Sequence, residues 1–137
     1  MQIEEMRGLV LGAPVARLGT IDPDGRPNLV PFVFALDGDE LLSVVDRKPK
    51  RTTALRRLQN LRRDPRATVL VDHYEDDWER VWWVRLRGNA RIIEAGADLE
   101  RTTRSLRAKY PQYGVVETED IAIIIRIEEW LGWRMRA

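Results

Sequence analysis

Two short turn signatures constrain the fold of this 137-residue chain more than any other feature. Asp22-Pro23-Asp24-Gly25 and Asp37-Gly38-Asp39 each separate stretches rich in apolar residues. Because proline presets φ for a turn and glycine accepts positive φ, both segments predict tight reversals of the chain. Three strands joined by such turns, over residues 15–21, 26–36 and 40–46, form an antiparallel meander.

The rest of the chain adds helices and longer strands. Apolar spacing predicts helices over residues 2–11, within 47–66 and over 97–110, and strands over 67–71, 80–95 and 121–135. The strands do not alternate regularly with helices, which argues against a doubly wound parallel sheet. Since barrel closure removes exposed strand edges, we expect a mainly β fold with flanking α-helices, an antiparallel barrel that is closed or nearly closed. Residues 1–137 would form a single domain of this kind.

Composition removes several classes of function. The chain has no cysteine and one histidine, which excludes thiolate metal sites, histidine-built metal sites and cysteine nucleophiles. Its net charge is +1, from 23 basic and 22 acidic residues, and no nucleic-acid motif accompanies it. Apolar runs such as residues 121–125 are too short to span a membrane, and the charged N-terminus is unlike a signal peptide. We therefore expect a cytoplasmic protein with no metal, no nucleic-acid partner and no membrane contact.

The most basic part of the chain is the segment 47–66, which holds nine basic residues and one acid, Asp64. Four of the cations precede the predicted helix: Arg47, Lys48, Lys50 and Arg51. Free N–H groups and the helix dipole already favour an anion there, so the segment predicts a phosphate or carboxylate site. The later arginines lie off the leucine face of the helix and fit a solvated surface: Arg56, Arg57, Arg62 and Arg63.

Five tryptophans are many for a chain of this length. Trp82 and Trp83 are neighbours on a predicted strand, so their side chains point to opposite faces and cannot enter the same core. At least one of them is expected to face a ligand, a partner subunit or solvent, and a dimer interface or an aromatic ligand pocket explains them better than exposure to water. Packing in a core or a dimer remains the plainer interpretation of the aromatic residues. The lone His73, at a strand end, is interpreted as structural.

Several segments, taken in order, resemble one protein family. They are residues 20–28, 30–31, 46–50, 58–67, 71–74, 84–90 and 130–134. The first two resemble the first hairpin of the FMN-binding split-barrel proteins, which include the pyridoxamine-phosphate-oxidase-like group. The next two resemble the family's cofactor-phosphate turn and the helix after it, and the last three resemble later strands. The resemblance covers nearly the whole chain.

The resemblance implies a function as well as a fold. The arginine-rich sequence is most similar to the deazaflavin (F-420)-dependent branch, whose members are small split-barrel homodimers with the cofactor at the dimer interface. It implies an oxidoreductase in which a reduced deazaflavin, or FMN as the alternative, transfers hydride to a small organic substrate. The other interpretation is a non-catalytic protein that binds a flavin or deazaflavin for storage or sensing.

The resemblance also implies which residues bind the cofactor. The basic turn would hold the phosphate, the second strand would line the ring, and two tryptophans of the second subunit would cover the ring or the substrate. These ten residues are Arg47, Lys48, Lys50, Arg51, Pro27, Asn28, Val30, Pro31, Trp78 and Trp82. No side chain is assigned a catalytic role, because the cofactor carries the hydride.

Overall fold

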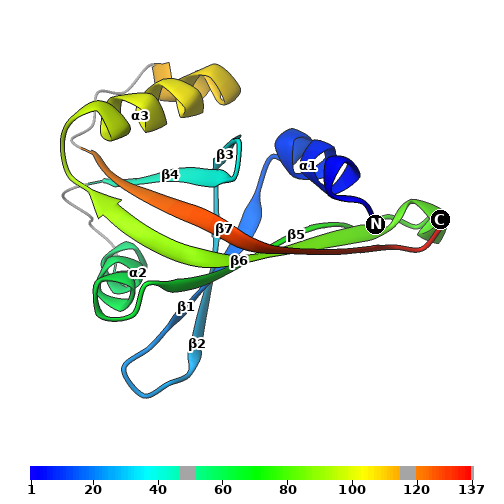
Figure 1. The fold of residues 1–137 in the computed structure, drawn as a ribbon, viewed down its shortest axis with the longest axis horizontal. Helices are drawn as coiled ribbons and strands as arrows, with labels where there is room; N and C mark the ends of the chain where they lie inside the picture. Colours follow the sequence, from blue (N-terminus) through cyan, green and yellow to red (C-terminus); the bar gives the residue numbers. More distant parts are fainter. Residues whose placement is uncertain (47–51, 115–119, 137) are drawn as a thin grey trace.

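The structure is a computed structural model that describes residues 1–46, 52–114 and 120–136 (Figure 1). Within these residues the chain forms three α-helices, two short 3-10 helices and seven strands. In order they are α1 (Ile3–Gly12), β1 (Ala16–Ile21), β2 (Pro27–Phe32), β3 (Ala35–Asp37), β4 (Glu40–Asp46), α2 (Thr52–Arg63), β5 (Arg66–His73), η1 (Trp78–Arg80), β6 (Trp82–Ile93), α3 (Ala97–Lys109), η2 (Pro111–Gly114) and β7 (Asp120–Arg134). No helix in the described part of the chain is long and apolar enough to cross a membrane.

The seven strands form one sheet in the order β2-β1-β5-β6-β7-β4-β3, and every neighbouring pair is antiparallel. The two edge strands, β2 and β3, follow one another in the chain and are separated only by Val33 and Phe34. The sheet therefore curls until its two edges meet at this link. The prediction of a mainly β, nearly closed antiparallel barrel with flanking helices is confirmed.

Strand β7 explains how the two cores of the molecule are built. Side chains alternate along a strand, so Ile121, Ile123 and Ile125 point into the main core inside the curled sheet, which α1 and α2 cover. Ala122 and Ile124 point the other way, into a smaller core under α3. The apolar run 121–125 is thus a strand buried on both faces.

Two glycines mark close approaches between elements. A glycine within a predicted strand indicates a bulge, a bend or an interruption, so the sequence predicts a bulge or bend at Gly88 and an interruption at Gly132. At Gly88 the register between β6 and β7 shifts, and a Cβ there would lie 1.9 Å from the carbonyl oxygen of Arg126, so this bulge is confirmed. The interruption predicted at Gly132 is wrong, because β7 continues through it and pairs Gly132 with Val84. A Cβ on Gly132 would lie 2.8 Å from the sulfur of Met6, so the glycine makes room for α1.

The predicted strand over residues 26–36 is two strands in the structure. Its first part, β2, pairs with β1, whereas its last part, β3, pairs with β4 at the other edge of the sheet. The chain must pass from one edge of the sheet to the other at Val33 and Phe34. Phe34 is fully buried at this link. The predicted helix within 47–66 is α2, and residues 47–51 lie outside the described residues.

Candidate functional site

A cavity of about 310 Å³ lies between the end of β2, β4 and α2. It is lined by Val15, Pro31, Phe32, Val33, Ser43, Val44 and Arg57. The lining is apolar except for one hydroxyl and one guanidinium group. Pockets for small molecules are mostly apolar with a few polar groups and measure about 300–1,000 Å³, so this cavity is at the small end of that range.

Hydrogen bonds and ring packing fix the β2 side of the cavity. The buried Ser43 donates its hydroxyl proton to the carbonyl oxygen of Val33 at 3.2 Å. The Phe32 ring packs against the Phe34 ring with 5.8 Å between centroids. This wall is therefore set by residues of β2, β4 and the link between β2 and β3.

A buried polar cluster fixes the helix on the other side. Asn60, which is 1% exposed, donates to Thr20 Oγ1 at 3.0 Å and to Asp22 Oδ1 at 2.9 Å. The Arg63 guanidinium donates to Asn60 Oδ1 at 3.0 Å and also to the carbonyl oxygen of Ile21. These contacts tie α2 to the β1–β2 hairpin.

The arginines of α2 do more than the sequence suggests. Arg57 is partly buried in the cavity lining, and Arg56 lies 3.5 Å from the Asp22 carboxylate. Arg56, Arg62 and Arg63 are exposed, as a solvated face predicts, although Arg56 and Arg63 also contact the β1–β2 hairpin and Arg62 lies 3.3 Å from Glu94. The interpretation as a solvated surface is wrong for Arg57, which is partly buried and lines the cavity.

The four predicted residues of β2 do not share one environment. Pro31 lines the cavity, whereas Pro27 is exposed and Val30 packs against the main core. The Asn28 side chain is partly buried, and its Nδ2 has no hydrogen-bond partner among the residues the structure describes. A buried donor without an acceptor costs about 1–3 kcal/mol, which a bound acceptor would recover. Asn28 is thus a candidate contact for a ligand.

The predicted basic turn falls outside the described residues. Arg47, Lys48, Lys50 and Arg51 lie there, so their contacts with a phosphate stay a prediction. In the sequence this turn joins β4 to α2, which are two of the three elements that line the cavity.

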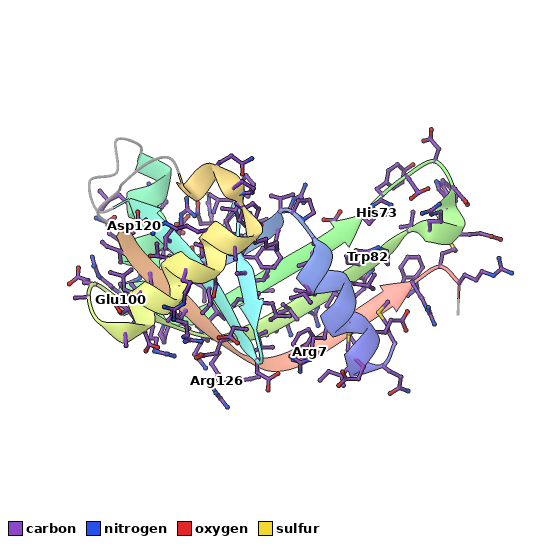
Figure 2. The ribbon with its side chains drawn as sticks, turned by 90° about the horizontal axis from the view of Figure 1, so that it is seen from above. Arg7, His73, Trp82, Glu100, Asp120 and Arg126 are labelled. Carbon is purple, nitrogen blue, oxygen red and sulfur yellow. The ribbon has the colours of Figure 1, made fainter. Side chains whose placement is uncertain are left out.

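The two predicted tryptophans lie at the other end of the sheet. Trp78 is 61% exposed in η1, at the tip of the β5–β6 hairpin, beside both chain termini and away from α2 (Figure 1). Trp82 packs against the main core and stacks on His73 with 6.3 Å between ring centroids. Figure 2 shows this pair at the opposite end of the molecule from Glu100 of α3. One chain therefore does not bring these tryptophans to the cavity, and their contact with a cofactor stays a prediction.

Trp83 lies on the outer face of the sheet, as the alternation predicts. It is partly buried and pairs in register with Trp133, which is 40% exposed. Its neighbour Trp82 is on the inner face, so the prediction that the two point to opposite faces is confirmed.

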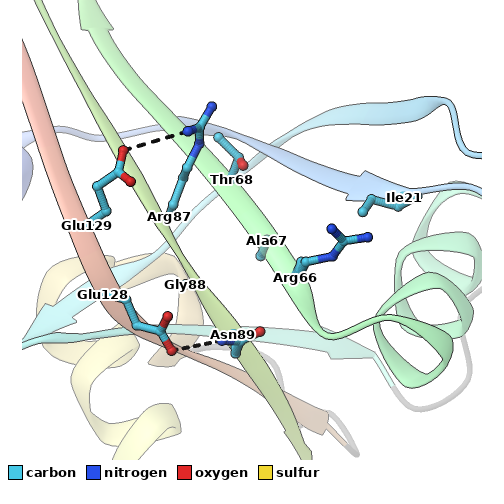
Figure 3. A pocket seen from close by; sticks show the side chains of 9 residues that line it. All are labelled: Ile21, Arg66, Ala67, Thr68, Arg87, Gly88, Asn89, Glu128 and Glu129. Atoms are coloured by element: carbon cyan, nitrogen blue, oxygen red, sulfur yellow. Dashed lines mark hydrogen bonds and ion pairs between the residues drawn. The ribbon is translucent and has the colours of Figure 1, made fainter.

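A larger groove of about 610 Å³ lies on the outer face at the Gly88 bulge (Figure 3). Its cations already have carboxylate partners: Arg66 lies 2.8 Å from Asp64 and Arg87 lies 3.7 Å from Glu129. Hydrogen bonds from Arg66 lower the pKa of Asp64 to about 2, so that carboxylate stays ionised. The charges of this groove are therefore already paired with one another. In the described ranges no cluster of three or more metal-ligating side chains is present.

The comparison with known protein families shows which family the chain belongs to. The family model described as pyridoxamine 5'-phosphate oxidase matches residues 3–134, nearly the whole chain. The chain belongs to the pyridoxamine 5'-phosphate oxidase family. This confirms the family resemblance expected from the sequence, and the deazaflavin-dependent branch stays a prediction.

Solved structures with a similar fold include proteins that are named for binding or storing different groups. A conserved hypothetical protein from Mycobacterium tuberculosis is 24% identical with a TM-score of 0.81, over 98% of this chain and 85% of that one. An FAD binding protein from Mycobacterium smegmatis is 17% identical with a TM-score of 0.73, over 99% and 98% of the two chains. HutZ, a heme storage protein from Vibrio cholerae, is 13% identical with a TM-score of 0.71, over 96% and 93%. At these identities the likeness shows the fold, and it confirms the split barrel for this member of the pyridoxamine 5'-phosphate oxidase family.

Proposed function

We propose that the protein is an oxidoreductase that uses a reduced deazaflavin (F-420) or FMN to transfer hydride to a small organic molecule, and that the cofactor binds in the cavity between β2, β4 and α2. The position of this cavity carries the proposal. Arg57 lines it, and the most basic turn of the chain joins two of the elements that line it. Membership of the pyridoxamine 5'-phosphate oxidase family and the similarity to an FAD binding protein support a flavin-type cofactor.

The residues present fit such a group. Pro31, Phe32 and Val44 offer apolar surface to a flat ring. Asn28 lies on β2 outside the cavity lining, and we propose that a ring extending along β2 accepts a hydrogen bond from its unpartnered Nδ2. The Arg57 guanidinium can bind a phosphate through two parallel hydrogen bonds. When bound, the reduced cofactor supplies the hydride. The chain's own residues would hold the ring, fix its orientation and keep water from one of its faces.

We propose a homodimer that pairs through the outer face of the sheet. Residues Pro31, Arg17, Leu70, Arg85 and Leu131 lie in register across five strands of this face. Leu29 is 69% exposed there, Leu131 44% and Leu70 39%. Exposed apolar patches of this kind commonly mark interfaces between proteins.

The dimer would also complete the cavity. Pro31 belongs both to the cavity lining and to this row of outer-face residues, so a second copy packed on this face would reach the cavity. The small volume of the cavity in one chain agrees with a site shared by two. We propose that Trp78 of the second copy, which is 61% exposed, covers the ring or the substrate. Trp82 packs against the main core on the inner face, so this interface does not bring it to the cavity. Light scattering at micromolar concentration should give twice the chain mass of 15.9 kDa, and a mass near 15.9 kDa would contradict the dimer.

A non-catalytic binding protein is the second candidate. The similar structures include a heme storage protein and a protein named only for binding FAD, so the fold also serves binding without a stated reaction. Turnover with reduced cofactor and a panel of small acceptors separates the two candidates. Stoichiometric binding with no oxidation of the reduced cofactor above the protein-free rate would favour storage or sensing.

The binding site is tested by titrating the purified protein with FMN and with the deazaflavin coenzyme, followed by fluorescence. Charged hydrogen bonds contribute about 1.5–3 kcal/mol each, so we expect Arg57→Ala, and separately Lys50→Ala with Arg51→Ala, to weaken binding at least about tenfold. The matched control is Arg104→Ala with Arg107→Ala, two exposed arginines of α3. Arg63 is unsuitable as a control because it bonds to Ile21. Equal losses in the control and site variants would mean that overall charge controls binding.

A further inference from the structure

We infer that the last turn of α3 is a positioning element for the cavity: Tyr110 and Lys109 hold the two chain segments that form its wall, so that ligand binding and the docking of this turn are coupled. The inference rests on the proposed function, since it concerns the same cavity. Neither residue lines that cavity, so both act through the residues that form its wall.

The Tyr110 hydroxyl joins two segments that are distant in sequence. Its oxygen lies 2.8 Å from the carbonyl oxygen of Pro14 and 3.1 Å from that of Phe34, and it accepts the Phe34 N–H at 3.4 Å. Burial raises the pKa of Tyr110, although a hydrogen bond with the Phe34 backbone opposes this, so the hydroxyl keeps its proton at neutral pH.

These two attachment points flank the cavity wall. Pro14 is directly followed by Val15, and Phe34 directly follows Val33, and both valines line the cavity. Val33 is held from the opposite side by the Ser43 hydroxyl. A change in the position of Tyr110 therefore moves the two backbone segments whose side chains form one side of the cavity.

Lys109 holds the same link by a second route. Its Nζ donates to the carbonyl oxygen of Phe34 at 3.0 Å and lies 3.9 Å from the centroid of the Phe34 ring. The Phe34 ring in turn packs against Phe32, which lines the cavity. A cation over an aromatic face is attractive, and more so when it is partly removed from water.

The rest of α3 is anchored independently of this turn. Arg101 lies 2.7 Å from Asp37 and 2.8 Å from Glu40, which belong to the β3–β4 hairpin. Leu99, in the first turn of the helix, packs against the smaller core. Loss of the contacts at the last turn should therefore leave the helix in place and affect mainly the link between β2 and β3.

The first test compares dissociation constants of FMN and of the deazaflavin coenzyme for the wild type, Tyr110→Phe, Lys109→Met and Lys109→Arg, at a temperature where all are folded. We expect about tenfold weaker binding for Tyr110→Phe and for Lys109→Met, and recovery of affinity in Lys109→Arg, which restores a cationic donor. Arg107→Met is the matched control for Lys109→Met, because Arg107 is an exposed cation in the same turn of α3. A purely stabilising role would lower the melting temperature and leave these constants unchanged, and that result would overturn the inference.

The second test needs no variant. Coupling is reciprocal, so a saturating cofactor should slow hydrogen exchange at the Tyr110 amide, which donates to the Leu106 carbonyl at 2.8 Å. Unchanged exchange at this amide in the wild type saturated with cofactor would also overturn the inference. If the wild type binds neither cofactor, the proposed function fails; if it binds but Tyr110→Phe binds equally well, only the inference about α3 fails.

Discussion

Replacement of Asn60 by alanine tests how α2 is held beside the cavity. The Asn60 side chain is 1% exposed and makes three hydrogen bonds, with Thr20, Asp22 and Arg63. A neutral hydrogen bond contributes about 0.5–1.5 kcal/mol and one to a charged group about 1.5–3 kcal/mol. Asp22 and Arg63 are accessible to water, which can replace part of the hydrogen bonding that each loses with Asn60. Thr20 is 2% exposed, so its lost hydrogen bond is not replaced by water. We therefore expect Asn60→Ala to cost about 2–4 kcal/mol, less than the simple sum of the three bonds.

Urea unfolding measures this cost directly. With an unchanged slope, the midpoint should fall in proportion to the lost free energy. The control is Gln59→Ala, the preceding and exposed residue of the same helix, where a surface change is expected to stay within about 0.5 kcal/mol. Because α2 also carries Arg57, loosening this helix should weaken cofactor binding as well. Equal urea midpoints for the two variants would refute the view that this buried cluster anchors α2.

Three further predictions follow from the packing and charges. Gly88→Ala should destabilise the folded protein by about 3 kcal/mol or more, because the new Cβ would lie 1.9 Å from a backbone oxygen. Gly8→Ala, in an open position of α1, should stabilise it by up to about 1 kcal/mol. Equal melting temperatures for the two variants would contradict this. Burial lowers the pKa of Lys109 from 10.5 to about 8. Between about pH 8 and pH 10.5 the unfolded chain therefore binds a proton at Lys109 that the folded chain does not, so the free energy of unfolding should rise with pH over this range. Urea unfolding should show this rise in the wild type more than in Lys109→Met. The deazaflavin coenzyme should bind more tightly than FMN at low salt, because its oligoglutamate tail adds carboxylates that are attracted to the basic segment. Salt screens such attractions over about 8–10 Å, so the deazaflavin coenzyme should also lose more affinity than FMN as salt rises. Dissociation constants of both cofactors at two salt concentrations check this.

Elements with a clear period could be predicted from the sequence alone. The strand expected over residues 40–46 has the observed bounds of β4, and the helix expected over 97–110 ends one residue earlier. The break between β2 and β3 could not be predicted in this way. Val33 and Phe34 are as apolar as the strands around them, and only the pairing of β2 with β1 and of β3 with β4 requires the chain to turn there.

The sequence predicts the part of the candidate site that lies within one continuous segment, and not the part that separate elements bring together. Pro31 was expected beside a ligand and lines the cavity. Ser43 and Arg57 were not expected, because they come from β4 and α2 and meet Pro31 only through the curl of the sheet. Arg57 resembled its solvated neighbours in the sequence, since a helical period separates the leucine face from the rest but does not show which polar residue faces a cavity.

The structure of the protein crystallised with FMN or with the deazaflavin coenzyme tests the central claim most directly. We predict that the ring lies between β2, β4 and α2, with Asn28 Nδ2 within hydrogen-bond distance of a ring acceptor and the phosphate beside Arg57. A cofactor bound instead in the outer groove beside Arg87, or one that leaves Asn28 Nδ2 without an acceptor, would contradict the account.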